Sequence, residues 1–248
     1  MDYLLLTLRA PLQSWGTHAA VGELRPSADH PGRSALAGLL AAALGIRRDK
    51  PEALLALHQA LRLAVRQDAG HGHMTDYHTT QAPPSTGQRV FRTRRDELVA
   101  QLGRNEALGT ILSRREYLLA AAFTVCLWLE GDAGCSLDEM AAALKRPLLP
   151  LYFGRKSCPP GFPLLPWRVQ ASHVLEALAQ YDAFRMETLA SLGEKAPAIT
   201  AARIWSDVPL DGPAHEMLLT VRDVLDDARR RQFGQRQEHV SLMPAAKP

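Results

Sequence analysis

The sequence predicts an α+β protein. We expect a ferredoxin-like (RRM-like) βαββαβ domain over residues 1–155, with a basic hairpin inserted at about 77–115, and a smaller β-rich domain over 156–248. Three observations predict it. Apolar runs at residues 3–8 and 120–130 are typical of buried strands. Helical patterns alternate with strands in the order that this fold requires. An arginine-rich segment interrupts that order between the second and third strands.

The first helix is predicted over residues 31–48. Leucines recur on one helical face at positions 36, 39, 40 and 44. Ser34 is a suitable N-cap, and Gly45 is a suitable stop. Arg33 stands where unpaired backbone N–H groups and the helix dipole favour an anion. We therefore expect Arg33 and Ser34 to bind phosphate; a packed helix with a solvated arginine is the alternative.

The other elements follow the same reasoning. Ser136 and Glu139 form a capping-box pattern, which predicts a helix over residues 136–145. The second strand is expected at 63–68, and the fourth strand at 148–153. In the C-terminal part we expect a helix at 172–181, strands at 201–205 and 216–222, and an acidic turn at 223–227.

The arm at residues 77–115 is the most basic part of the chain. It holds seven arginines against three acidic residues, an excess larger than the net charge of +3 of the whole chain. Arginines interleaved with Tyr77, Phe91 and Tyr117 suit single-stranded nucleic acid, because arginines track phosphates while aromatic faces stack on bases. A solvated charged loop is the alternative interpretation.

Two loops at strand ends carry further polar candidates. Arg9, Gln13 and Trp15 follow the first strand, where functional loops are common. A packed tryptophan beside a surface arginine would explain the same residues. Arg155 and Lys156 follow Gly154 in a turn that can offer charge and backbone donors to a phosphate. This turn lacks the glycine spacing of a Walker motif.

Metal ions, cofactors and membranes are not expected. Cys126, Cys135 and Cys158 have no regular spacing, so they predict neither a disulfide framework nor a zinc site. His71 and His73 are candidate metal ligands, but no cluster of carboxylates or cysteines near them in the sequence completes a metal-binding set. No signal peptide or membrane-length apolar segment is visible, so we expect a cytoplasmic location.

Several short motifs, in this order and spacing, resemble a known family. They are Leu8-Arg9 with Gln13-Ser14-Trp15-Gly16, Arg33-Ser34 leading into Gly38-Leu39-Leu40 and Gly45-Ile46-Arg47-Arg48, Val65-Arg66 with Asp68, Asp76-Tyr77-His78-Thr79, Arg115-Glu116-Tyr117-Leu118, and Tyr152-Phe153-Gly154-Arg155-Lys156-Ser157-Cys158-Pro159. The chain resembles the fifth Cas family, within the repeat-associated mysterious protein superfamily, as found in type I-E CRISPR Cascade complexes. The resemblance covers most of residues 3–160 and is looser in the last third.

The resemblance implies an RNA-binding subunit that is not an enzyme and caps the 5′ handle of the CRISPR RNA. The arm would be a thumb that packs against the neighbouring Cascade backbone subunit, with the large subunit docked nearby and target DNA reached through the complex. The expected RNA contacts are Arg9, Gln13, Trp15, Arg33, Ser34, Tyr77, His78, Arg115, Arg155 and Lys156.

Two other functions stay open at this point. Subunits of this family process precursor CRISPR RNA in a different CRISPR subtype, so a metal-independent endoribonuclease using Tyr77, His78 and Lys156 is the main alternative. Tyr77 and His78 are a poor couple if they lie on a strand, because neighbouring strand residues face opposite ways. A standalone RNA-binding protein outside CRISPR is the other alternative.

Overall fold

The computed structural model describes residues 1–17, 23–82, 91–103, 109–193, 199, 202–212 and 216–243. Arg89 and Arg104, which add to the predicted charge of the arm, lie outside these ranges. The helices are α1 (Arg33–Leu44), α2 (Pro51–Ala60), α3 (Arg94–Leu102), α4 (Leu137–Lys145) and α5 (Val174–Ser191). The longer strands are β1 (Asp2–Arg9), β6 (Leu61–Ala69), β7 (Gly72–Ala82), β8 (Gly109–Leu119), β9 (Ala122–Leu129), β10 (Trp167–Gln170), β11 (Ala202–Ser206), β12 (Glu216–Asp227) and β13 (Gln232–Met243). Within these ranges, no helix has the length and apolar character needed to cross a membrane.

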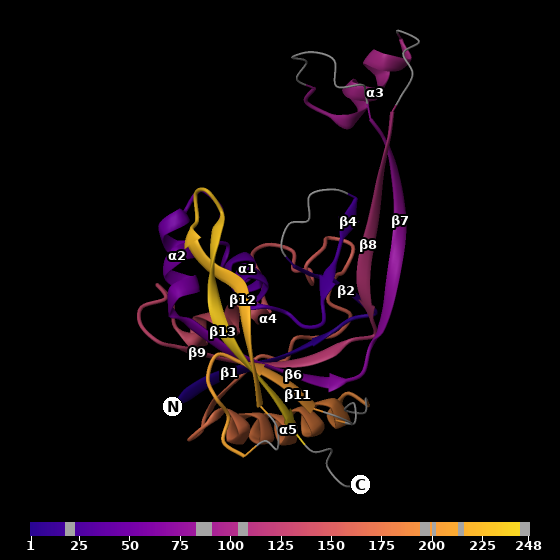
Figure 1. Cartoon of the computed structure of the whole chain (residues 1–248). Coiled ribbons are helices and arrows are strands. Elements are labelled where there is room, and N and C mark those ends of the chain that lie inside the picture. The colour runs from indigo at the N-terminus through magenta and orange to yellow at the C-terminus, as the bar shows by residue number, and fades with distance from the viewer. Residues whose placement is uncertain are drawn as a thin grey trace.

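A mixed α/β architecture with an antiparallel seven-stranded sheet organises the chain. Its strand order is β10-β1-β9-β6-β11-β13-β12 (Figure 1). The interior strand β9 reads Ala-Phe-Thr-Val-Cys-Leu-Trp-Leu and is buried along almost its whole length, as expected for a strand covered on both faces. The buried strand predicted at residues 120–130 is therefore confirmed.

The predicted fourth strand at 148–153 is wrong. The strand on the outer side of β1 is instead β10, which pairs antiparallel with β1 from Asp2–Gln170 to Leu5–Trp167. The backbone N–H groups of Leu148 and Leu149 instead donate to the carbonyls of Ala43 and Ala42, near the end of α1. The last carbonyls of a helix need such partners, so this segment closes α1 and does not join the sheet.

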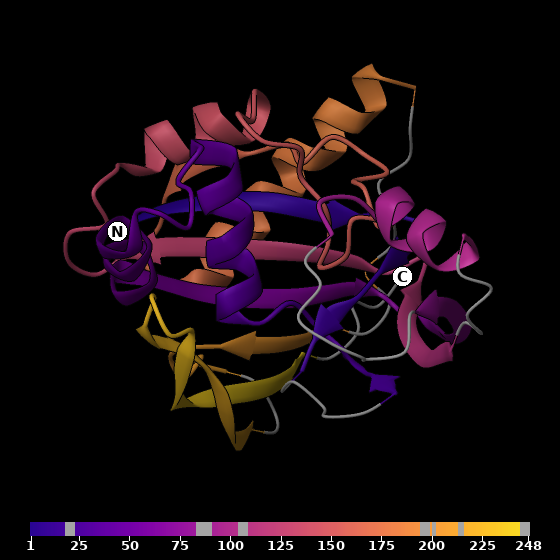
Figure 2. The same ribbon diagram turned by 90° about the horizontal axis from the view of Figure 1, so that it is seen from above.

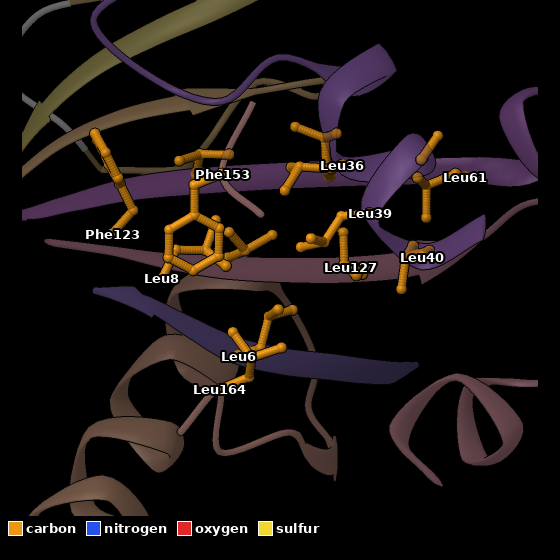
Figure 3. Packing of buried hydrophobic residues seen from close by; sticks show 14 of the residues in the cluster. Leu6, Leu8, Leu36, Leu39, Leu40, Leu61, Phe123, Leu127, Phe153 and Leu164 are labelled. Atoms are coloured by element: carbon orange, nitrogen blue, oxygen red, sulfur yellow. The ribbon is translucent and has the colours of Figure 1, made fainter. Parts of the chain in front are cut away.

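The two faces of the sheet are covered by different helices (Figures 1 and 2). Alternation along β1 sends Leu4, Leu6 and Leu8 into one core with α1, α2 and α4, whereas Tyr3 and Leu5 enter a second core under α5. In the larger core, Leu36, Leu39 and Leu40 of α1 meet Leu6, Leu8, Phe123 and Leu127 of the sheet (Figure 3). Burying each such side chain contributes roughly 1.5–3 kcal/mol.

The helix ends agree with the sequence at two places and differ at one. Ser136 and Glu139 form the predicted capping box at α4, and Gly45 ends α1 in the left-handed conformation with φ of 73°. The N-cap of α1 is Gly32, not Ser34, and the first backbone N–H of the helix, that of Arg33, donates to the carboxylate of Asp223. Ser34 is therefore the second residue of the helix, where its hydroxyl is not needed for capping.

Helix α5 is tied to its face of the sheet by buried charges. Arg185 and Arg66 both donate to Asp68, Arg66 Nη2 lies 2.6 Å from Asp182, and Thr124 donates to Asp68 across 2.7 Å. RNA-recognition modules stack bases on an open sheet face. Here Tyr3, Leu5 and Trp128 on that face are covered by α5, so this face offers no platform for bases.

The C-terminal strands continue the same sheet. β11 pairs with β6 from Ile204–Arg66 to Ser206–Ala64, so the hydrogen-bonded sheet runs across the expected boundary at residue 155. β12 extends through 223–227, where an acidic turn was predicted, and pairs with β13 to Asp227. The division into domains 1–155 and 156–248 stays a prediction.

A long hairpin leaves the body of the molecule. β7 pairs with β8 from Gly72–Leu119 to Ala82–Gly109, and α3 lies at its far end (Figure 1). The short strands β2 (Leu12–Gln13) and β4 (Leu24–Arg25) pair with β8 near its base, and β3 (Trp15–Gly16) pairs with β5 (Ser27–Ala28). The base of the hairpin is thus hydrogen-bonded, through β2 and β4, to the segment that follows β1.

Candidate nucleic-acid interface

Arg155 is held at the base of the hairpin. Its guanidinium donates to the carbonyl oxygens of Glu116 and Arg25, at 3.0 and 2.7 Å, and lies 4.6 Å from the centre of the Tyr117 ring. These partners are neutral, so the positive charge of Arg155 is not cancelled by them. Through these bonds Arg155 connects β4, β8 and the turn after Gly154, and its positive charge is held in a fixed position where the three segments meet.

Lys156 lies within the same turn, and Arg9 contacts the segment that follows it. Lys156 is exposed. The Arg9 guanidinium lies 5.3 Å from the centre of the Phe162 ring, and the Arg9 carbonyl accepts from Gly161 N–H. Both cations are placed where a phosphate can approach them from solvent.

The hairpin separates the predicted residues onto two faces. Asp76 pairs with Arg115 and His78 with Ser113, so these four side chains share one face, and His78 Nε2 is bonded to the Asp76 carboxylate. Arg115 Nε lies 3.3 Å from Ser113 Oγ. Tyr77 pairs with Arg114 on the opposite face, and its side chain is 55% exposed. Tyr77 and His78 therefore do not meet.

Gln13 and Trp15 are internal supports, not exposed contacts. Gln13 is fully buried and donates to the carbonyl of Ala121 at 2.8 Å, while its own oxygen accepts from Trp15 Nε1 at 3.1 Å. Trp15 is 1% exposed and packs beside Phe153. We reassign both residues from RNA contacts to supports of the loop, because their polar atoms are already used inside the protein.

Arg33 is also internal. Its Nη2 lies 2.7 Å from Asp207, and its backbone N–H donates to Asp223 across 2.6 Å. Both carboxylates are further bound by Arg236, which also reaches Glu238. The protein's own acids occupy the anion site predicted at the start of α1, so we reassign Arg33 to a structural role.

A groove of about 1080 Å³ lies along α1. Its floor includes Ser34, Gly38 and Ala42, which recur every fourth residue on one side of the helix. A Cβ built on Gly38 would meet no atom within 4 Å. This strip of small residues leaves the groove open; of the predicted contacts, only Ser34 lines it.

The walls of the groove are basic and partly aromatic. Arg47, Arg48, Arg229 and Arg231 line it against a single acidic residue, Asp49, and Tyr152 and Phe233 stand among them. Arg229 is paired with Glu52 at 2.8 Å. Within the described residues, Arg47, Arg48 and Arg231 have exposed side chains with no ion-pair partner. The groove therefore carries uncompensated positive charge.

His58 lines the groove from α2 without adding to that charge. Burial, together with the nearby positive charge of Arg33, lowers the pKa of His58 to about 4. The ring is therefore neutral near pH 7. Its Nδ1 is buried without a hydrogen-bond partner among the described residues.

The groove residues were missed as contacts by the sequence argument. Arg47 and Arg48 come two and three residues after Gly45, and Arg229 to Arg231 form a run, so the sequence shows both groups of positive charge. The sequence does not show that the two groups lie close together in space. About 180 residues separate them along the chain, and only the packing of β12 against α1 and α2 brings them together.

Comparison with known proteins agrees with the motifs. The chain belongs to the CRISPR-associated protein (Cas_Cas5) family, which matches residues 3–238. The CRISPR system Cascade subunit CasD of Escherichia coli (strain K12) is 34% identical in an alignment 247 residues long, which covers 96% of this chain and 95% of CasD. The family resemblance predicted from the sequence is therefore confirmed.

Two solved structures share the fold. One, described as a CRISPR RNA-guided surveillance complex, has a TM-score of 0.62 and 25% identity, covering 98% of this chain and 90% of its own. Another, described as the crystal structure of a Cas protein, has a TM-score of 0.61 and 27% identity, covering 98% and 95%. The mixed α/β fold with its antiparallel sheet is shared across these relatives.

Proposed function

We propose that this chain is a non-catalytic subunit of a type I-E Cascade surveillance complex, where it caps the 5′ handle of the CRISPR RNA in the cytoplasm. The observation that carries the proposal is the groove above α1, where Arg47, Arg48 and Arg231 lie beside Tyr152 and Phe233 and have no ion-pair partner in the part of the chain that the structure describes. Cations that track phosphates beside aromatic rings are the features that bind single-stranded RNA. The relationship to CasD supports the assignment to Cascade.

The strand order β10-β1-β9-β6, with α1 and α4 on one face, supports a ferredoxin-like unit as the core of the chain. In this proposal the β7–β8 hairpin is the thumb and packs against the backbone subunit. The large subunit docks nearby, and target DNA is reached through the assembled complex. Arg9, Ser34, Tyr77, His78, Arg115, Arg155 and Lys156 remain proposed RNA contacts, to which we add the groove arginines.

The endoribonuclease alternative is weakened by the hairpin. Tyr77 and His78 are successive residues of β7, so their side chains leave the strand on opposite faces. A phenol and an imidazole on opposite faces cannot serve one 2′-hydroxyl and one leaving oxygen together.

One gel series tests the proposal. Labelled precursor and mature CRISPR RNA are mixed with the protein in EDTA at several salt concentrations, alone and assembled with the backbone subunit. We expect salt-sensitive binding without cleavage. Arg48→Gln and Arg231→Gln should each lower the slope of log affinity against log salt by about 0.7.

Arg168→Gln is the matched control, since Arg168 lies on β10 at the opposite edge of the sheet and is paired with Asp2. An unchanged slope in both groove variants would exclude the groove as the RNA site. Specific cleavage that His78→Ala abolishes would instead identify a processing enzyme.

A further inference from the structure

A second cavity, of about 530 Å³, lies at the base of the hairpin, away from the groove. Its lining includes Asp29, His71 and His73. One ring nitrogen from each histidine and one carboxylate oxygen of Asp29 all lie within 4.8 Å of one another. These are the side-chain types that bind first-row transition metals.

The chain builds this cluster from two distant segments. His71 directly precedes β7 and His73 is its second residue; the spacing of two puts both rings on one side, with centroids 5.0 Å apart. Asp29 comes just after β5, and its Oδ1 lies 3.9 Å from His73 Nε2. The sequence offered the histidines without a carboxylate, because Asp29 lies 42 residues earlier than His71.

One atom of the cluster lacks a partner. His71 Nδ1 is buried and, among the described residues, makes no hydrogen bond of ordinary geometry, although backbone groups of Asp29 and Gly72 lie near the ring. A buried polar atom without a partner costs free energy that a ligand can recover. His73 and Asp29 have side chains that are 61% and 57% exposed, so both can move the short distance that coordination at about 2.0–2.2 Å requires.

We propose that Asp29, His71 and His73 bind a divalent transition-metal ion of the Zn²⁺ type. Two imidazoles and one carboxylate leave a fourth position open to water. Arg203 lines the same cavity, but its guanidinium lies over the Trp205 ring, 5.8 Å from the ring centre. The metal fastens the root of β7 to the segment after β5, and so fixes the direction in which the hairpin leaves the body.

The test titrates the untagged 248-residue chain with Zn²⁺ by calorimetry, and with Co²⁺ by visible absorption. We expect one metal ion per chain, d–d bands typical of nitrogen and oxygen ligands, and a rise in melting temperature with Zn²⁺. His73→Ala and Asp29→Asn should each weaken binding by roughly 10- to 100-fold or more.

His78→Ala is the matched control, because His78 lies on the same strand and is also bonded to a carboxylate. It should bind metal like the unmodified chain. Since His73 and Asp29 are exposed, their variants should fold, which circular dichroism verifies. The proposal is overturned if no saturable binding occurs, if binding survives the combined His73→Ala and Asp29→Asn change, or if His78→Ala abolishes it.

Discussion

The guanidinium of Arg33 lies 2.7 Å from the carboxylate of Asp207, and both side chains are at most 10% exposed. Asp207 also accepts from Arg236 at 2.8 Å and from the backbone N–H of Leu63 at 2.9 Å. A carboxylate thus joins the start of α1 to β6 and β13. This cluster places α1, and with it the floor of the groove, against the C-terminal strands.

Removing Asp207 should be costly. In Asp207→Ala, two buried arginines lose a shared anion, so we expect the free energy of unfolding to fall by about 3–5 kcal/mol in urea denaturation. Glu52→Ala is the control: it breaks the fully exposed pair with Arg229 and should leave the unfolding midpoint unchanged. A loss below about 1 kcal/mol for Asp207→Ala would show that the buried cluster does not stabilise the fold.

Stability should fall in mild acid because of His58. Its pKa is about 4 in the folded protein against an ordinary value of 6.5. The unfolded chain therefore takes up a proton first, and stability present above pH 6.5 is lost as the pH falls toward 4. The loss attributable to this residue is about 3 kcal/mol at pH 4.

Urea denaturation between pH 7 and pH 4 measures this loss, with His58→Leu as the comparison. The variant lacks the titrating ring, so its stability should depend less steeply on pH over the same range. Parallel curves for the two proteins would mean that His58 is not the group responsible.

Gly154 should not tolerate a side chain. Its φ is 83°, and a Cβ would stand 1.6 Å from the carbonyl oxygen of Ser14. Gly154→Ala should therefore destabilise the protein by more than the roughly 1–2 kcal/mol of left-handed backbone alone. Gly193→Ala isolates that part, because Gly193 has a φ of 75° with no atom within 4 Å of a Cβ. Equal melting temperatures for the two variants would argue against the contact with Ser14.

Filling the groove should block RNA without unfolding the chain. Gly38 lies inside α1 with open space above it, so Gly38→Ala should stabilise the protein by about 0.5–1 kcal/mol. Gly38→Leu places a branched side chain in the groove and should weaken RNA binding by about tenfold or more, near 1.4 kcal/mol. Filter binding of both variants measures this. If Gly38→Leu binds RNA as well as Gly38→Ala does, the groove is not the path of the RNA.

Local chemistry made the element-level predictions reliable. The capping box of Ser136 and Glu139, the stop at Gly45 and the apolar run of β9 each depend on neighbours in sequence, and each is present in the structure. The strand predicted at 148–153 failed because its apolar residues are also suited to close α1, and residue types alone do not say which use prevails.

The sequence by itself determined the buried strands β1 and β9, the main helices, the excess of positive charge over residues 77–115 and the family of this protein, because those depend on periodicity, composition and short motifs. Tertiary structure alone decided which of the described arginines are paired with acids. Arg33 and Arg236 are neutralised by acids from distant strands, whereas Arg47, Arg48 and Arg231 face solvent together. Whether an arginine is paired depends on carboxylates that folding brings close to it, and the spacing of residues along the chain does not predict that proximity.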